Sequence, residues 1–470
     1  MQASTLSVKT AYRPTVRLST VFEGLSNALD MTEGHPRGHA TRSALIGLRL
    51  GRALKFSPRD QTDLLYALLL KDAGCSANAA LVCDLFGGQS DQEVKRAVWM
   101  RDWRKVPEQI RYAFQYIEKG GSLMARLRRF GHFAVRHAHG DNTQVFAVRC
   151  ERGANIARMI GLPERVAEAI RAMDEHWDGG GYPYGHKRDR TPLLARVIGL
   201  AQVAEIFWSE GGPEAAIAVA RDRRGRWFEP TLVDAFVHAA AHDGFWAGLE
   251  DARLERDLLT LVPADLELAL DATVLDRIAD AFALIIDAKS PFTADHSRRV
   301  SQYASAINER LGTVVDPVRL RRAGLLHDIG KLSVPNRILD KPGRLDLDER
   351  QTIQQHTTHT LSLLEHVPIF FEFADDAANH HEWIDGHGYS RGLAGDQLTP
   401  TARILAVADV LDAVTSDRPY QARMPVEKVQ SLFTRESGTH FDEACVDACL
   451  GGVLEHAMTQ APETARVAVA

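Results

Sequence analysis

The hydrophobic positions of this chain recur at intervals of three and four residues over most of its length. Clear examples are LSTVFEGLSNALD (18–30), VLDRIADAFALIIDA (274–288) and VSQYASAINERLG (300–312). This spacing gathers apolar side chains on one face of an α-helix. Alternating apolar and polar residues between tight turns, which are typical of strands, are almost absent. The pattern therefore predicts an all-α fold of antiparallel helical bundles.

The helical pattern occurs twice along the chain, which indicates an internal repeat. Five segments of the first half match five segments of the second half in the same order. The pairs are 38–51 with 295–312, 68–76 with 324–333, 175–185 with 382–392, 193–207 with 400–414, and 225–236 with 438–449. A chain of 470 residues is also long for one hydrophobic core. We therefore expect two tandem domains of the same type, residues 1–255 and 256–470.

The first copy is longer than the second at one place. Asp72 and Arg149 are 77 residues apart, whereas the matching Asp328 and His356 are 28 residues apart. This difference predicts an insertion near residues 84–140, a locally basic segment with a helical pattern. Two interpretations of the insertion stay open: a solvated surface element, or a surface for dimerisation or regulation.

Charge and cysteine content narrow the class of protein. The chain has 56 Lys and Arg against 62 Asp and Glu, so its formal charge of −6 does not suggest binding to nucleic acid. Its five cysteines form no CxxC pair, which favours reduced thiols. No apolar run reaches the roughly 18 residues of a membrane span. Residues 1–20 lack the continuous apolar region of a secretory signal. We therefore expect a cytoplasmic protein.

Seven side chains of the second half have the composition of a ligand set for two adjacent divalent cations. They are His296, His327, Asp328, His356, His380, His381 and Asp409. Neighbouring residues on a helix point about 100° apart, so a metal between helices can collect both His327 and Asp328. The two oxygens of Asp328 can bridge two cations. We expect His296 and Asp409 to complete one metal, and His356, His380 and His381 to complete the other.

The mixed nitrogen and oxygen ligands suit Fe, Mn or a similar first-row metal better than Mg or Ca. Two such metals would lower the pKa of a bridging water. The sequence therefore predicts a binuclear metal site in the second half.

The first copy has lost most of these residue types. The matching positions are His39, Lys71, Asp72, Arg149, Met173, Asp174 and Gln202. Lys71 and Arg149 would repel a cation, so we expect no metal-dependent hydrolysis in the first half. Three alternatives stay open for its role: a packing or dimer partner of the second half, a recognition surface, or a nucleotide site formed by Lys71 and Arg149.

The segment from about 270 to 458 resembles the HD-GYP family, the phosphodiesterase branch of the HD superfamily. The matching motifs are HSRRV (296–300), HDIGK (327–331), HTTHT (356–360), HHEWIDGHGYSRGL (380–393), ARILAVADVLDAVTSDRPY (402–420) and GTHFD (438–442). The resemblance implies hydrolysis of cyclic di-GMP to pGpG, GMP or both, through a binuclear metal centre and a bridging hydroxide. The first half resembles a degenerate copy of the same domain.

The resemblance also implies roles for single residues. Asp328 and Lys331 would be catalytic, and Lys331 would neutralise phosphate charge near the metals. The positions that match substrate-contacting residues of the family are Lys331, Asp412, Arg418, Gly388 and Tyr389. For Asp412 a local hydrogen-bond network, and for Arg418 a surface ion pair, are the alternative roles.

Three positions depart from the family pattern. Ser390 stands where the GYP signature has proline, and Ile384 stands where tryptophan is usual before Asp385. Both lie in the loop that is thought to shape the substrate mouth and to meet partner proteins. Family members with three metals have a glutamate four residues before the first histidine, and Phe292 is found there. We therefore expect two metals.

The same ligands would serve other reactions, because metals bind phosphate and not the base. One alternative is hydrolysis of another cyclic dinucleotide, such as a hybrid cyclic GMP-AMP, or of a generic phosphoester. Another is a non-catalytic cyclic di-GMP signalling adaptor, although an adaptor has no chemical need for a complete ligand set. Beyond the cyclic dinucleotide, the expected partners are a diguanylate cyclase or another signalling protein, and a second copy of the chain in a homodimer.

Overall fold

The computed structural model describes residues 16–102, 105–117, 122, 124, 126–131, 141–250, 254–263, 266–417 and 423–460. Within these ranges the elements are helices, and the β-type pairing consists of two isolated bridges, Arg224 with Phe228 and Ser437 with Phe441. The all-α fold predicted from the hydrophobic pattern is confirmed.

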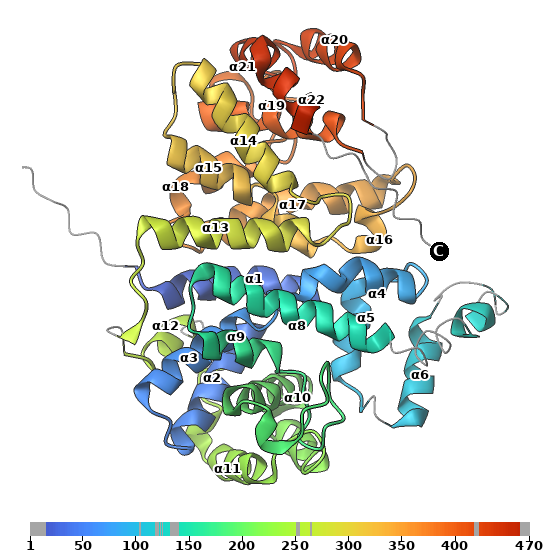
Figure 1. The fold of residues 1–470 in the computed structure, drawn as a ribbon, viewed down its shortest axis with the longest axis vertical. Coiled ribbons are helices and arrows are strands. Elements are labelled where there is room, and N and C mark those ends of the chain that lie inside the picture. The colour runs from blue at the N-terminus through green and yellow to red at the C-terminus, as the bar shows by residue number, and fades with distance from the viewer. Residues whose placement is uncertain are drawn as a thin grey trace, which may run out of the picture.

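The helices form two stacked groups, which follow the two halves of the sequence (Figure 1). The first group contains α1 (Leu18–Glu33), α2 (His39–Ala53), α3 (Pro58–Leu70), η1 (Cys75–Asn78), α4 (Ala79–Leu85), α5 (Asp91–Trp99), α6 (Val106–Tyr116), α8 (Asp141–Ile160), α9 (Glu164–Arg171), η2 (Arg188–Arg190), α10 (Leu193–Asp222), α11 (Pro230–Ala240), η3 (Asp243–Phe245) and α12 (Leu254–Leu259).

The second group repeats this order in a shorter form. It contains α13 (Ala272–Asp287), α14 (His296–Arg310), α15 (Pro317–Leu326), η5 (Ile329–Ser333), α16 (Asn336–Leu339), α17 (Leu347–Glu365), α18 (Phe371–Ala378), η6 (Gly395–Gln397), α19 (Pro400–Thr415), α20 (Val426–Glu436), α21 (Glu443–Ala448), η7 (Cys449–Val453) and α22 (Leu454–Gln460).

Local sequence explains where several of these helices begin. The side chains of Ser57, Asp316 and Thr399 accept hydrogen bonds from the backbone N–H groups of the first turns of α3, α15 and α19. Each of the three is followed by a proline at the first helical position, which has no N–H to satisfy and already has a helical φ. α15 and α3 both end directly before the predicted metal-ligand pair or its counterpart.

The two groups pack directly on each other. α1 lies against η5 and α17, and α8 lies against α13. A Cβ atom on Gly24 would come within 2.7 Å of Val367 Cγ2, so the backbone of α1 approaches the second half closely. One hydrophobic cluster runs through both halves, from Leu25 in α1 to Ile278 in α13. The domain boundary at 255/256 stays a prediction. α12, which begins at Leu254, packs against α1 and α2.

The insertion forms helices, as its sequence pattern predicts. α5, α6 and residues 126–131 lie within residues 84–140, and α6 lies at the side of the first half (Figure 1). α4, α5 and α6 share a small core of their own, made by Val82, Leu85, Phe86, Val94, Tyr112, Ala113 and Ile117. No helix among the described residues is both long and apolar enough to cross a membrane.

Candidate metal centre

The seven predicted metal ligands come from five parts of the second half and meet between the helices. His296 begins α14, and His327 directly follows the last residue of α15. Asp328 directly precedes η5, and His356 lies in α17. The remaining three are His380 and His381, just after α18, and Asp409 in α19. The structure thus brings together residues that lie up to 113 positions apart in the sequence.

The first group of ligand atoms belongs to His296, His327 and Asp409, which lie within 4.8 Å of one another. His296 Nε2 is 3.3 Å from Asp409 Oδ1, and His327 Nε2 is 3.8 Å from the same oxygen. Two imidazole nitrogens and a carboxylate oxygen therefore face one small volume, and this donor set suits a first-row divalent metal.

The second group belongs to His356, His380 and His381, whose ligand atoms also lie within 4.8 Å of one another. His356 Nε2 and His380 Nε2 are 3.5 Å apart. Burial lowers the pKa of His356 to about 4 and of His381 to about 3, and it lowers the pKa of His380 well below the usual value. Near neutral pH the three rings are uncharged, so their nitrogen lone pairs are available to a metal.

Asp328 lies between the two groups with one oxygen toward each. Oδ2 is 3.3 Å from Nε2 of both His296 and His327. Oδ1 is 3.4 Å from His356 Nε2 and 3.8 Å from His380 Nε2. One oxygen of Asp328 therefore faces each ligand group, and its role as a bridge between two metals stays a prediction.

Backbone carbonyls hold three of the imidazoles in one orientation. Nδ1 of His327 lies 2.8 Å from Gly324 O, and Nδ1 of His356 lies 2.6 Å from Ile353 O. Nδ1 of His380 makes the same contact with Ala377 O at 2.6 Å. Because a carbonyl only accepts, each Nδ1 must carry a proton and donate it, and this contact turns Nε2 of each ring toward the centre.

His296 is held by side chains instead. Its Nδ1 lies 2.7 Å from Asp412 Oδ2, and Arg299 Nε donates to Asp412 Oδ1 at 2.5 Å. Asp412 is only 1% exposed and orients His296, which fits the local hydrogen-bond network that the sequence left as the alternative role. Its contact with substrate stays a prediction. Arg299 belongs to no predicted ligand set, although the internal repeat aligns it with Arg42 and thereby marks the position.

Several donor atoms of the centre have no hydrogen bond. His296 Nε2, His327 Nε2 and Asp328 Oδ1 are buried and unsatisfied within the described part of the chain. Burial would raise the pKa of Asp328, but His327 and Lys331 beside it hold that pKa well below its usual value. A bound cation would supply the missing partner for these buried ligand atoms and would balance the charge of the ionised carboxylate. The residues present therefore fit two divalent metals.

Lys331 lies at the edge of the centre, as its predicted role requires. Its Nζ donates to Asp328 Oδ2 at 2.5 Å. Both residues line a cavity of about 1050 Å³, whose wall also includes Phe292 at the position where a third metal would need a glutamate. The cavity wall also carries two positively charged side chains that were not predicted from the sequence, Arg344 and Arg350. They lie in no recognisable motif, so no sequence signal indicated them.

The signature loop packs its backbone against the residues that follow α18. A Cβ atom on Gly388 would lie 2.4 Å from Trp383 N, so only glycine fits there. Tyr389 N donates to His381 O at 3.1 Å, and the ring centroids of Tyr389 and His381 are 4.8 Å apart. Burial raises the pKa of Tyr389, which keeps its hydroxyl protonated. Arg418 lies outside the described residues.

Comparison with known proteins places the chain in a family. The HD domain family model matches residues 138–232 and 280–445. The chain is 38% identical over 438 residues to 3′3′-cGAMP-specific phosphodiesterase 3 of Vibrio cholerae, a match that covers 92% of this chain and 94% of that protein. It is 36% identical to 3′3′-cGAMP-specific phosphodiesterase 1 of the same organism, over 71% of this chain and 79% of that protein.

A solved structure agrees with these matches. The crystal structure of a cyclic GMP-AMP specific phosphodiesterase from V. cholerae matches with a TM-score of 0.61 and 33% identity, over 95% of this chain and 98% of that chain. A cyclic di-GMP phosphodiesterase response regulator from Xanthomonas campestris pv. campestris is 37% identical over 38% of this chain and 47% of that protein. The chain therefore belongs to the HD domain family, in its HD-GYP branch of metal-dependent cyclic dinucleotide phosphodiesterases.

Proposed function

We propose that the chain hydrolyses 3′3′-cyclic GMP-AMP. The observation that carries the proposal is the match of both halves, 92% of the chain, to a relative named as specific for that dinucleotide. The family resemblance of the sequence implies cyclic di-GMP, with the hybrid dinucleotide as an alternative. The catalytic half alone does not distinguish them, because its metal ligands would contact phosphate in either substrate.

The proposed centre has two metal positions. His296, His327 and Asp409 would hold one metal, and His356, His380 and His381 would hold the other, with Asp328 between them. Fe or Mn suits this set of nitrogen and oxygen donors. When bound, the two metals supply Lewis acidity and a nucleophile at neutral pH.

The other residues of the site would bind the substrate and fix its position. Lys331 beside Asp328 places an ammonium next to the scissile phosphate. A cyclic dinucleotide has two phosphates, and Arg344 and Arg350 in the cavity wall offer guanidinium groups for the second one. The volume of about 1050 Å³ is at the upper end of the usual range for ligand pockets, which suits a ligand with two nucleotides.

Cyclic di-GMP is the second candidate substrate. The chain also matches relatives named as cyclic di-GMP phosphodiesterases from X. campestris pv. campestris, Thermotoga maritima and Pseudomonas aeruginosa, at 35–38% identity. These matches cover 37–41% of the chain, so they support the reaction type and leave the choice of base open.

The test is a kinetic comparison of 3′3′-cyclic GMP-AMP, cyclic di-GMP and cyclic di-AMP with the purified full chain reconstituted with Mn²⁺ or Fe²⁺. We expect the highest kcat/KM for 3′3′-cyclic GMP-AMP and linear or fully cleaved nucleotides as products. His356→Ala should abolish turnover, whereas His366→Ala, an exposed histidine at the end of the same helix, should not. Binding of a dinucleotide without turnover under every metal condition would support the adaptor alternative instead.

A further inference from the structure

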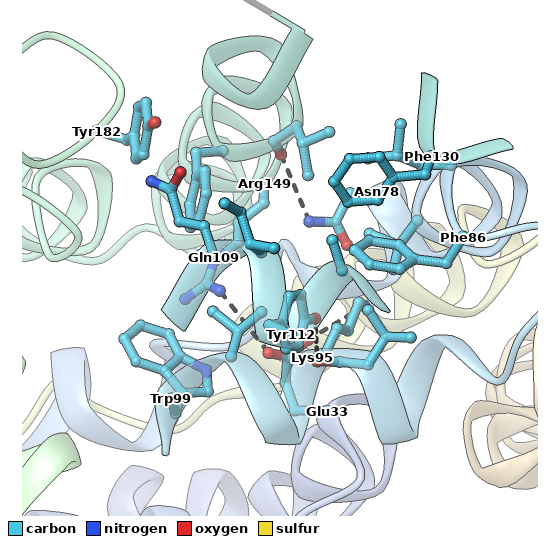
Figure 2. A pocket seen from close by; sticks show the side chains of 18 residues that line it. Glu33, Asn78, Phe86, Lys95, Trp99, Gln109, Tyr112, Phe130, Arg149 and Tyr182 are labelled. Atoms are coloured by element: carbon cyan, nitrogen blue, oxygen red, sulfur yellow. Dashed lines mark hydrogen bonds and ion pairs between the residues drawn. The ribbon is translucent and has the colours of Figure 1, made fainter. Parts of the chain in front are cut away.

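The first half retains a cavity where the second half has its catalytic cavity. This cavity has a volume of about 270 Å³ and lies among α4, α5, α6 and α8 (Figure 2). Its wall includes Arg149 and Phe146, the counterparts of His356 and Ile353 in the catalytic cavity. Glu33, the counterpart of Ser290, lies at its floor. The two cavities therefore lie at matching positions of the repeat, but different residue types line them.

The wall of this first-half cavity is rich in aromatic rings, which Figure 2 shows around the open space. Six aromatic residues take part: Phe86, Trp99, Tyr112, Phe130, Phe146 and Tyr182. The insertion supplies much of this wall, because α5 and α6 have no counterpart in the catalytic half. Aromatic and aliphatic walls with a few polar groups are typical of sites for small apolar ligands.

The cations at the floor are already paired with carboxylates. Lys95 Nζ lies 3.1 Å from Glu33 Oε1, and Arg149 Nη1 lies 3.7 Å from Glu33 Oε2. Arg149 Nε is also 3.3 Å from Asp174 Oδ2. A phosphate would have to compete with these buried carboxylates, so the geometry disfavours the nucleotide site that Lys71 and Arg149 suggested in the sequence.

The side-chain oxygen of Asn78 in the cavity wall can accept a hydrogen bond from a ligand. Asn78 is 4% exposed, and its Nδ2 donates to Val145 O at 3.4 Å. Its Oδ1 is buried and has no hydrogen-bond partner within the described residues. A ligand that donates one hydrogen bond to this oxygen would satisfy it.

Helix α5 connects this cavity with the catalytic half. Val94, Lys95 and Val98 of α5 line the cavity. At the start of the same helix, Gln92 Nε2 lies 3.4 Å from Leu332 O and 3.0 Å from Ser333 O, next to Lys331 in η5.

Asp91 extends this connection to the wall of the catalytic cavity. Asp91 Oδ1 accepts a hydrogen bond from Asn336 N at 3.0 Å, and Asp91 Oδ2 lies 3.6 Å from Lys289 Nζ. Lys289 is 1% exposed and lines the catalytic cavity. A movement of α5 would therefore reach both η5 and Lys289.

We propose that the first-half cavity is an effector site for an uncharged aromatic molecule with one hydrogen-bond donor, and that α5 couples its occupancy to the metal centre. Rings of the ligand would stack within the aromatic wall, and its donor would bond to Asn78 Oδ1. Because coupling between two sites is reciprocal, metal binding must change the affinity of this cavity for its ligand.

Binding is tested with N-phenyl-1-naphthylamine, an uncharged aromatic amine that becomes fluorescent in apolar sites. The full chain should bind one probe molecule saturably. Ala113→Phe, which fills the cavity from α6, and Ile110→Trp, which narrows it at an exposed position, should each weaken binding by at least about tenfold. The matched control Gln115→Phe adds the same ring on the exposed face of α6 and should leave the affinity unchanged.

Coupling is tested by repeating the titration with saturating Mn²⁺. The probe affinity should shift by at least about threefold in the wild type, and Gln92→Ala should abolish the shift while keeping probe binding. Absence of saturable binding, or equal affinity in the wild type and the folded Ile110→Trp variant, overturns the effector site. Probe binding that Mn²⁺ leaves unchanged overturns the coupling. Neither result depends on which dinucleotide the chain hydrolyses, so failure of the proposed function remains distinguishable.

Discussion

The two halves orient their first histidine, His296 or His39, through the same hydrogen bonds, although the residues around it differ. In the second half His296 Nδ1 contacts Asp412, and Arg299 holds that carboxylate. The first half has the same arrangement: His39 Nδ1 contacts Glu205, and Arg42 Nε donates to Glu205 at 2.6 Å. Both halves therefore retain the carboxylate and the arginine that orient this histidine, although the first half has other residues at the positions of the candidate metal ligands.

The replacements place positively charged side chains in the first half where the second half has candidate metal ligands. Lys71 Nζ lies 3.1 Å from His39 Nε2 and forms an ion pair with Asp72, the counterpart of Asp328. Arg149 places its guanidinium beside Asp174 and within 3.9 Å of Asp72. A buried aspartate requires positive charge nearby. The second half would obtain that charge from metals, and the first half obtains it from an ammonium and a guanidinium, which supply no Lewis acid.

The signature loops are also built alike. Glu382 accepts hydrogen bonds from the N–H groups of Arg391 and Leu393, and Glu175 accepts them from Tyr184 and His186. The comparison teaches that hydrogen bonds to backbone groups preserve the loop independently of the centre. The signature loop is therefore found with and without the candidate metal ligands, so the ligand set is the better indicator of hydrolytic activity.

The largest expected effect comes from the bridging aspartate. Asp328→Asn should lower kcat/KM by on the order of 10⁴-fold, about 5.5 kcal/mol, because it removes the anion between the two metals. The measurement is steady-state hydrolysis together with metal content by elemental analysis. The matched variant Asp72→Asn should keep kcat/KM within about threefold while the protein is folded. Equal losses in both variants would contradict the division of roles between the halves.

The next effect concerns the stability of the first half. Arg149→Met should destabilise it by about 3–5 kcal/mol, because Glu33, Asp72 and Asp174 would keep buried negative charge without their partner. Chemical denaturation of the metal-free chain measures this change. Arg158→Met, on the same helix but at a more exposed ion pair, should cost about 1 kcal/mol or less. If Arg149→Met lowered the free energy of unfolding by as little as Arg158→Met, the charge of Arg149 would not be needed for stability.

A smaller effect is expected at the carboxylate that orients His296. Asp412→Asn should lower metal affinity or kcat/KM by roughly 10–100-fold, since the amide weakens the hydrogen bond that fixes the imidazole. Metal titration by calorimetry and hydrolysis rates give the two numbers. An increase of KM alone, with unchanged metal affinity, would instead favour the substrate contact that the family resemblance suggested.

The smallest effect is a pH dependence that belongs to the first half. Burial would raise the pKa of Glu33, but Lys95 and Arg149 lower it to about 2, below its usual value of 4.5. The ionised group therefore contributes stability above pH 4.5, and this contribution is lost as the pH falls from 4.5 toward 2. Unfolding free energies of the wild type and Glu33→Gln should converge through this window. A constant difference would refute the assignment, and Ser290 at the matching position of the second half has no such titration.

The sequence by itself determined the helical class and the internal repeat, and it predicted the seven side chains that the structure brings together as candidate metal ligands. Periodicity and residue chemistry are local properties, and the order of the histidines and aspartates can be read without coordinates. The loss of ligands in the first half was equally visible, because Lys71 and Arg149 align with His327 and His356.

Only the tertiary structure decided which groups pair with one another. It placed Asp412, 116 residues from His296, behind that imidazole, and it brought Gln92 to Ser333 across 241 residues. It also showed that the insertion helices cover a cavity and contact the catalytic half. Hydrogen bonds and ion pairs depend on distances of a few ångströms between segments far apart in the chain, and no periodic pattern records those distances.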